Sequence, residues 1–372
     1  EDILQLSKYI ISGGDKSSFN SGIDSKKVVK SEKMDYSLEL VLDDLEIPWG
    51  MTWLPNGDML VCERKGRLTR NTKDGKQFEI AGVPEVYQFG QGGLLDIELL
   101  PEYKKNRWIF ITYSYPAGEH RNDGRSTALM RARLKNDELV DQEILWKATP
   151  AEKKGAHYGS RIEFDGKGHV FVTIGDRGVG ANAQKITNHS GAVHRLNDDG
   201  SIPRDNPFVN IPGAVASIYN YGHRNIQGLA FHPETGELWS HEHGPRGGDE
   251  LNIEEPGKNY GWPEISYGIN YDGTIFTEDS ARAGMEQPLI HWTPSIAPCG
   301  MDFVEGDVYP AWKGNLLVGS LRFKYVLRCE LDGQKVVSQE RIVVDHGRVR
   351  DVKMGPDGYI YVGIENPGRI VK

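Results

Sequence analysis

The sequence lacks the features that mark several common classes of protein. No apolar run reaches the roughly 18 residues of a transmembrane helix, and no cluster of Lys and Arg offers a surface for a polyanion. The formal net charge of −9 also argues against nucleic acid as the main partner. Cys62, Cys299 and Cys329 form no CxxC motif, which excludes a zinc site of that kind and allows at most one disulfide. Cys62 and Cys329 lie in apolar runs, which favours buried free thiols.

Segments with the period of a helix are also scarce, whereas glycine is abundant. The 44 glycines recur along the whole chain and indicate many tight turns between short strands. Six stretches share one pattern: an apolar strand, a turn that usually contains glycine, and a second strand that ends in small or polar residues. They are WGMTWLPNGDMLVCERKGRL (49–68), GGLLDIELLPEYKKNRWIFITYS (92–114), SRIEFDGKGHVFVTIGDRG (160–178), QGLAFHPETGELWSHEHG (227–244), GMDFVEGDVYPAWKGNLLVGS (300–320) and RDVKMGPDGYIYVGIENPGRI (350–370). This spacing indicates antiparallel hairpins.

Six copies of one hairpin predict an all-β fold, a six-bladed β-propeller of four-stranded antiparallel blades over residues 36–372. A β-sandwich is the competing fold, but it would not repeat one hairpin six times. Residues 1–35 are rich in Ser, Lys, Gly and Asp and predict a polar N-terminal arm or linker. Within it, Ile3 to Ile11 could form a short helix or the remnant of an anchor. In a propeller, loops from different blades converge on one end of a central channel, so distant polar residues can share a site.

The stretch from residue 220 to 262 concentrates polar side chains among glycines and prolines. Its glycines let a ligand approach the backbone closely, because no Cβ stands in the way. We interpret the stretch as a rim that binds something small, polar and anionic. A sharply turning, solvated connection between strands is the alternative. His241 and His243 form only a weak HxH metal motif.

The same stretch offers oxygen ligands for a hard cation. They are the carbonyls of Gly244, Pro245 and Tyr260 and the carboxylate of Glu250. Oxygen ligands of this kind suit Ca²⁺ better than Zn²⁺.

His157 is the candidate for proton transfer. It stands before the first strand of the third hairpin, between Gly155 and Gly159, which leaves one side open to approach. A histidine titrates near neutral pH and is the usual general base. A structural hydrogen-bonding role is the alternative for a single histidine at the start of a strand.

The candidates for ligand binding occupy corresponding loop positions in other hairpins. The guanidinium group binds carboxylates through two parallel hydrogen bonds, so isolated arginines on channel loops indicate a ligand with several carboxylates. Four such arginines in an acidic protein are hard to explain as solubilising charge, although any one alone could be a surface ion-pair partner. The candidates are Gln91, Arg224, Asn225, Arg322, Arg348 and Arg350.

Together these residues resemble the soluble quinoprotein aldose sugar dehydrogenases of the glucose/sorbosone dehydrogenase family. The matching stretches run in the family's order over roughly residues 40–372 and form a specific set, although no single one would be specific. They are GQGGLLDIELLPEY, HYGSRIEF with VTIGDRG, YGHRNIQGLAFHP, EHGPRGGDELN, NYGWP, PSIAPCGMDF and RVRDVKMGPDGYIYV.

The resemblance implies a propeller that binds pyrroloquinoline quinone, a tricarboxylate ortho-quinone, together with Ca²⁺. Such an enzyme oxidises the C1 hydroxyl of an aldose to the lactone and passes electrons to an external acceptor. His157 matches the base that takes the hydroxyl proton while hydride passes from C1 to C5 of the quinone. The residues that match cofactor contacts are Gln91, Arg224, Asn225, Tyr271, Arg322, Arg348 and Arg350.

The resemblance also implies calcium ligands and a location. Gly244 and Pro245 match carbonyls that bind the cofactor's Ca²⁺ in glucose dehydrogenase, whereas Glu250 and Tyr260 match ligands in the aldose sugar branch. Whether these pairs hold one ion or two is left open. The family implies a periplasmic or otherwise exported protein. The chain is also short of the long insertions that shape the glucose dehydrogenase pocket, which points to an open cleft and broad aldose specificity.

Two positions depart from the family pattern. Ala156 precedes the base where glucose dehydrogenase has an acidic residue, and Arg322 stands where it has a lysine.

Two other functions are alternatives for a propeller of this kind: a non-catalytic ligand-binding propeller and a Ca²⁺-dependent hydrolase of the lactonase type. The lactonase would need carboxylate and Asn side chains around one central metal, where this chain offers arginines. A binding module would have no use for a base at His157.

Overall fold

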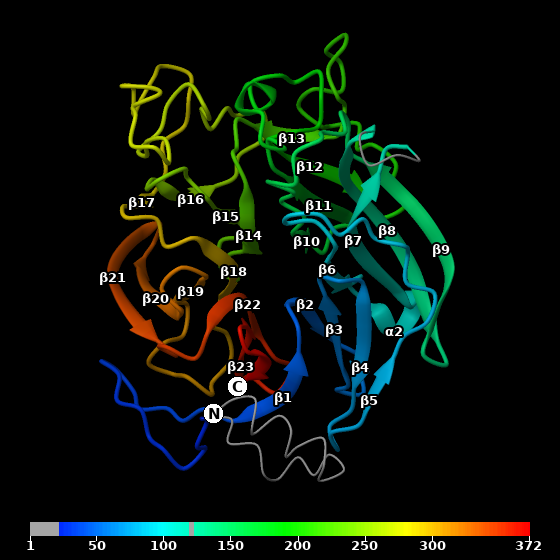
Figure 1. Cartoon of the computed structure of the whole chain (residues 1–372), viewed down its shortest axis with the longest axis vertical. Helices are drawn as coiled ribbons and strands as arrows, with labels where there is room; N and C mark the ends of the chain where they lie inside the picture. Colours follow the sequence, from blue (N-terminus) through cyan, green and yellow to red (C-terminus); the bar gives the residue numbers. More distant parts are fainter. Residues whose placement is uncertain (1–21, 119–122) are drawn as a thin grey trace.

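The computed structural model describes residues 22–118 and 123–372, so the expected feature at Ile3 to Ile11 and most of the N-terminal arm lie outside the described residues. The described residues form six four-stranded antiparallel sheets around a central axis (Figure 1). The predicted six-bladed β-propeller is confirmed. Helical elements among these residues are few and short, such as α2 (Tyr103–Asn106) and the 3₁₀ turn η3 (Gly180–Asn182).

The first three blades follow one another along the chain, each from its inner to its outer strand. Blade 1 contains β2 (Pro48–Trp53), β3 (Met59–Glu63), β4 (Arg67–Asn71) and β5 (Gln77–Glu79); blade 2 contains β6 (Leu94–Leu99), β7 (Trp108–Pro116), β8 (Arg125–Lys135) and β9 (Glu138–Lys147); blade 3 contains β10 (Ile162–Phe164), β11 (His169–Ile174), β12 (Ala192–Asn197) and β13 (Ile218–Tyr221).

The last three blades repeat this order, except that the outer strand of blade 6 comes from the start of the propeller. Blade 4 contains β14 (Ile226–Phe231), β15 (Leu238–Glu242), β16 (Asp249–Ile253) and β17 (Ile290–Trp292); blade 5 contains β18 (Pro298–Phe303), β19 (Leu316–Ser320), β20 (Tyr325–Asp332) and β21 (Lys335–Ile342); blade 6 contains β22 (Arg348–Met354), β23 (Ile360–Glu365), β24 (Gly368–Val371) and β1 (Leu40–Leu45). The pairing of β1 with β24 closes the ring, with Leu40 opposite Val371.

Each predicted hairpin corresponds to the two inner strands of one blade. Inner strands are covered on both faces by neighbouring blades, so β3, β15 and β19 are buried at every position. Outer strands such as β21 alternate between exposed and covered residues. The hydrophobic core therefore lies between adjacent blades. In one such interface Trp239 of blade 4 meets Phe303 of blade 5 edge to face, with ring centroids 5.7 Å apart.

The described part of the N-terminal segment, residues 22–35, lies against blades 5 and 6. Ile23 and Met34 pack on the apolar cluster of these blades. The Glu32 N–H donates to Glu340 at 2.7 Å, and the Lys33 ammonium lies 2.5 Å from the Glu330 carboxylate.

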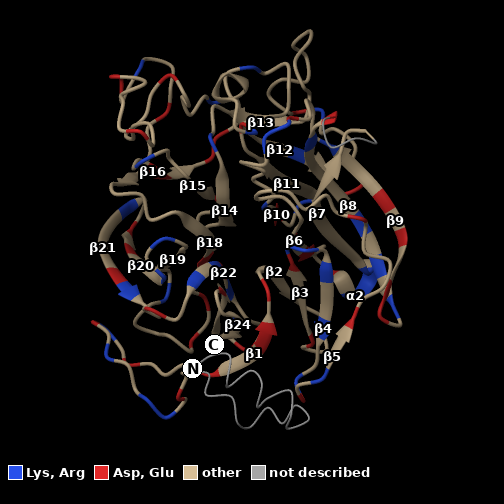
Figure 2. Ribbon diagram, viewed as in Figure 1, with Lys and Arg blue, Asp and Glu red and all other residues tan. Residues whose placement is uncertain are grey.

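Three further features concern the distribution of charged residues, the state of the cysteines and the question of a membrane-spanning helix. Figure 2 shows acidic and basic residues interspersed along the outer strands. Cys62, Cys299 and Cys329 are all buried and free, which confirms the expectation for the first and third. None of the described helices has the length and hydropathy needed to cross a bilayer.

Candidate active site

The predicted site residues lie at one end of the propeller. In an antiparallel hairpin the first strand begins where the second ends, so residues before each inner strand meet residues after its partner. Hydrogen bonds across blades tie this end together: the Gln91 side chain accepts from the His157 N–H at 2.7 Å, and Asn225 Oδ1 accepts from the Gly159 N–H at 3.1 Å. The predicted residues placed at this end are Gln91, His157, Arg224, Asn225, Arg322, Arg348 and Arg350.

His157 lies shortly before β10 and is held from two sides. Besides the bond to Gln91, its ring Nδ1 lies 2.5 Å from Oδ1 of Asp176. A carboxylate only accepts, so Nδ1 carries the proton and Nε2 keeps its lone pair. The side chain is 14% exposed, which leaves it sheltered but reachable. The backbone of His157 adopts a φ of 56°, a strained value for a residue with a side chain and one that clusters at functional sites.

The surroundings of His157 set the protonation state that a general base needs. Burial lowers the pKa of His157 below its ordinary value, the bond to Asp176 opposes this shift, and the charge of Arg224 adds to it. Burial alone would raise the pKa of Asp176, but the bond to His157 and the nearby cations lower it below its ordinary value. At neutral pH the imidazole is therefore neutral and the carboxylate is ionised.

Asp176 and Trp262 are parts of the site that sequence reasoning missed. The indole N–H of Trp262 donates to Asp176 Oδ2 at 2.7 Å, and the Gly178 N–H donates to Oδ1 at 2.6 Å. The sequence did contain a signal for Asp176. This residue follows the second strand of the third hairpin, and that strand ends beside the start of the first strand, where His157 stands. Trp262 lies in the family stretch NYGWP, but nothing local indicated that its indole reaches Asp176 from the loop after blade 4's third strand.

Protonation of His157 removes the general base and therefore the activity. Because the pKa of His157 is lowered from 6.5, we expect the acid limb of the pH profile of kcat/KM to lie below pH 6.5. Asp176→Asn removes the carboxylate that raises this pKa, so the limb should move to still lower pH. Turnover should also fall by about 100- to 10⁴-fold, because an amide does not hold the ring in the required tautomer.

The measurement is the pH profile of kcat/KM for both proteins. Asp165→Asn is the matched control, because Asp165 makes a similar 2.6 Å contact with Nδ1 of His169 outside the site. An acid limb that Asp176→Asn leaves in place would contradict the assignment.

Glu242, the last residue of β15, orients the two predicted binding residues of blade 4. Its carboxylate accepts the backbone N–H of Arg224 at 2.5 Å and that of Asn225 at 3.1 Å. Because Asn225 is also bonded to the loop of His157, the base and both binding residues form one connected unit.

A buried histidine supports Glu242 from behind. His223 Nδ1 lies 2.8 Å from Glu242, and Nε2 lies 3.2 Å from Glu254. Burial alone would lower the pKa of His223, but the charges of Glu254 and Glu242 raise it to about 10. The resulting imidazolium offsets part of the buried negative charge.

Arginines gather beside blade 6. Arg348 Nε lies 2.5 Å from one oxygen of Glu365, and Arg350 Nη2 lies 2.9 Å from the other. Arg64, from the loop after β3, joins them: burial lowers its pKa, and the charge of Arg350 lowers it further. Its buried Nε finds no hydrogen-bond partner among the described residues. Arg348 and Arg350 share the single carboxylate of Glu365, and Arg64 lies close enough to feel their charge, which fits an anionic ligand. Sequence reasoning missed Arg64, although it also follows a hairpin's second strand.

Two predicted cofactor contacts are less closely tied to this unit. Arg322 is exposed, with its guanidinium 3.4 Å from the Ser295 carbonyl and 5.2 Å from the Phe323 ring. Tyr271 lies on a turn and is 73% exposed. Their roles toward a cofactor stay predictions.

The predicted calcium ligands gather in part around one small cavity. Gly244, Glu250 and Tyr260 line it together with Glu242, and its volume of about 10 Å³ suits one water or one ion. Pro245 is buried in the adjoining turn. Burial, and then the charge of Glu242, raises the pKa of Glu250 well above its ordinary value. Carboxyl groups enclosed in this way fit a hard cation.

Side chains alone would not complete such a site. Within the described ranges no three or more His, Cys, Asp or Glu side chains gather as metal ligands do. His241 and His243, the weak HxH motif, bond instead to the carbonyls of Gly300 and Pro298 at 3.2 and 2.8 Å. Burial lowers the pKa of each to about 3, so both are neutral links between blades 4 and 5.

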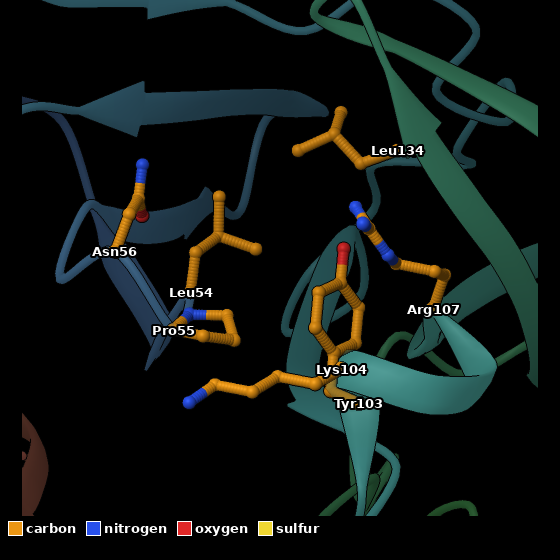
Figure 3. Close-up of a pocket in the computed structure, with 7 residues that line it drawn as sticks. All are labelled: Leu54, Pro55, Asn56, Tyr103, Lys104, Arg107 and Leu134. Atoms are coloured by element: carbon orange, nitrogen blue, oxygen red, sulfur yellow. The ribbon is translucent and has the colours of Figure 1, made fainter.

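A separate hollow of about 310 Å³ lies at the other end of the hairpins, between blades 1 and 2 (Figure 3). Tyr103 of α2 projects into it toward Leu54, with Arg107 beside its hydroxyl. It lies away from His157 and brings no base together with the arginines, so the chemistry is assigned to the end that holds His157.

A sequence model of the Glucose / Sorbosone dehydrogenase family matches residues 45–372. The chain belongs to this family. Aldose sugar dehydrogenase YliI of Escherichia coli (strain K12) is 42% identical over 346 residues, which cover 90% of this chain and 92% of that protein. The resemblance stated from the sequence is thus confirmed, and with it the class of dehydrogenases, which are oxidoreductases.

Solved structures agree with this assignment. The apo-form of the soluble aldose sugar dehydrogenase of Escherichia coli superposes with a TM-score of 0.87 at 39% identity, over 90% of this chain and 98% of that one. The PQQ-bound form of aldose sugar dehydrogenase from Streptomyces coelicolor gives a TM-score of 0.74 at 27% identity, again over 90% and 98%.

Proposed function

We propose that the chain is a quinoprotein oxidoreductase that oxidises the C1 hydroxyl of aldose sugars to the lactone. The observation that carries the proposal is a neutral base, His157, held by Asp176 at the same end of the channel as the arginine cluster of blade 6. The PQQ-bound relative supports the choice of cofactor.

The side chains have distinct roles in this reaction. When bound, pyrroloquinoline quinone supplies the acceptor for the hydride from C1. Nε2 of His157 takes the proton of the C1 hydroxyl, while Asp176 stabilises the imidazolium that forms. Arg224 lies close enough to lower the pKa of His157, so its charge also acts on the oxygen that loses the proton.

The cofactor's carboxylates would be bound by the arginines on Glu365. Arg348 and Arg350 are suited to this because they share one carboxylate, and Arg64 because its buried Nε finds no hydrogen-bond partner among the described residues. Gln91 accepts from His157 through its oxygen, which leaves its amide N–H groups as donors. Asn225, Arg322 and Tyr271 complete the proposed set.

We propose Ca²⁺ as the companion ion, held by Gly244, Pro245, Glu250 and Tyr260. The enclosed carboxyl of Glu250 and its neighbour Glu242 support this choice. Such an ion would act as a Lewis acid toward the cofactor and hold it in register.

The test is to mix the purified protein with pyrroloquinoline quinone and Ca²⁺ and to follow dye-linked oxidation of a panel of aldoses. We expect activity that requires both additions. Quinone binding without oxidation of any sugar would overturn the substrate and leave the cofactor site standing. Failure to bind the quinone would overturn the cofactor assignment and favour a ligand-binding propeller, whereas lactone hydrolysis with Ca²⁺ alone would favour the lactonase.

We further propose that residues 36–372 form the catalytic domain and that the protein works outside the cytoplasm, periplasmic or otherwise exported. Use of the quinone outside the cytoplasm in the family supports this location. Cell fractionation with a cytoplasmic marker enzyme tests it, and recovery with that marker would overturn it.

A further inference from the structure

An exposed aromatic ring stands on the rim beside His157. Phe89 is 46% exposed and lies two residues before Gln91, whose side chain holds the base. Aromatic side chains commonly line small-molecule sites, so the place of Phe89 next to the loop of the base makes it a candidate contact for a ligand.

The Phe89 ring is fixed in place. The Arg125 guanidinium covers one face, with its carbon 4.1 Å from the ring centroid. Arg125 itself is 4% exposed and donates to the Lys153 carbonyl at 2.8 Å. With one face covered and nearly half of the residue exposed, the opposite face is open to solvent. A ring already held in one orientation loses little conformational entropy when a ligand stacks on it.

The ring is also tied to the loop of the base. A Cβ added to Gly155 would come within 2.5 Å of the Phe89 ring, so the ring edge rests where a side chain would otherwise stand. Gly155 is two residues before His157, and its carbonyl accepts from the Gln91 N–H at 2.8 Å. Phe89 and His157 therefore lie on two loops packed side by side, with the ring toward the rim.

We propose that Phe89 forms a subsite for the second sugar unit of an aldose disaccharide, on the rim side of the ring that is oxidised. The inference rests on the proposed function and names a substrate class for the same site. An apolar face on a polar rim suits the C–H face of a pyranose, because the ring's negative π face attracts C–H groups. The exposed Lys153, whose carbonyl is bonded to the Arg125 that covers the ring, can donate to the sugar's hydroxyl groups.

The test compares kcat and KM for glucose and for maltose in the quinone-loaded protein and in its variants. Phe89→Ala should raise KM for maltose by about threefold to tenfold, leave kcat unchanged, and leave KM for glucose unchanged. Phe89→Tyr keeps the stacking face and should retain the wild-type KM. Phe89→Leu keeps apolar volume without that face, so it tests the same point should the alanine variant be unstable.

Phe78 offers a matched control. It is 38% exposed and has the Arg70 guanidinium 4.4 Å from its ring centroid, but it belongs to β5 on the outer edge of blade 1. Phe78→Ala should therefore change KM for neither sugar. An equal loss for glucose and maltose in Phe89→Ala would overturn the subsite and show that the ring supports the base loop. No change for either sugar would overturn it as well.

A binding measurement separates this inference from the proposed function. If the wild-type protein oxidises neither sugar, the proposed function fails, and calorimetric titration of maltose into the protein decides about the subsite. Binding by the wild type and Phe78→Ala, with loss in Phe89→Ala, supports it. Absence of maltose binding to the wild type overturns it.

Discussion

Replacing His157 with alanine should lower kcat by about 100-fold or more and leave the affinity for pyrroloquinoline quinone nearly unchanged. The reason is geometric: His157 presents Nε2 as a lone pair, while Nδ1 is engaged by Asp176 at 2.5 Å. Removing the imidazole removes the proton acceptor but leaves the arginines on Glu365 intact. The measurements are steady-state turnover with saturating quinone and a separate titration of quinone binding.

His169→Ala serves as the control for the loss of an imidazole. His169 also pairs with an aspartate, Asp165, through Nδ1 at 2.6 Å, but it stands at the start of β11, away from the site. Its replacement should leave turnover within about twofold of the wild type, since surface changes away from such features cost little. A parallel loss of quinone binding and turnover in His157→Ala would show that His157 is structural.

Replacing Arg348 with alanine should weaken the binding of pyrroloquinoline quinone by about 10- to 100-fold, the worth of one charge-assisted hydrogen bond. The Arg348 side chain is 40% exposed, and its carboxylate partner Glu365 keeps Arg350 at 2.9 Å when Arg348 is removed. The fold should thus be preserved, while the positive charge left for the ligand's carboxylates decreases. The measurement is the Kd from a quinone titration, with the Tm as a check on folding.

Arg133→Ala is the matched control for Arg348. Its side chain is also 40% exposed, and it pairs with one carboxylate, Asp141 at 3.0 Å, on the outer half of blade 2. It should leave the quinone Kd unchanged. An Arg348→Ala protein that binds the quinone as tightly as the wild type would remove Arg348 from the cofactor site.

The parts of the fold that the sequence revealed are those whose signal is local. Each inner hairpin combines an apolar run with a turn a few residues long, so β2 with β3 and β22 with β23 could be placed before any tertiary structure was known. The short outer strands gave no such signal. Strand β17 (Ile290–Trp292) follows a long loop and exists because β16 offers it a free edge. Likewise, only the folded ring brings β1 to β24.

The same distinction holds for the site. His157, Arg224 and Arg348 were predicted because each stands at a hairpin end and matches a family motif. Asp176 and Arg64 were missed, since an acidic or basic residue in a turn resembles an ordinary solvated charge until its partner is known. Trp262 required the loop after β16 to fold back onto blade 3, where its indole reaches Asp176 at 2.7 Å.

The sequence by itself determined the number of blades, the end of the channel that carries chemistry, and the residue types available there. These follow from local patterns, since alternation, turn residues and hairpin ends are written in consecutive positions. Tertiary structure alone decided which charges meet: Asp176 with His157, Glu242 with Arg224, and Glu365 with its arginines. Protonation depends on burial and on charges within a few ångströms, and those distances exist only after the blades close into a ring.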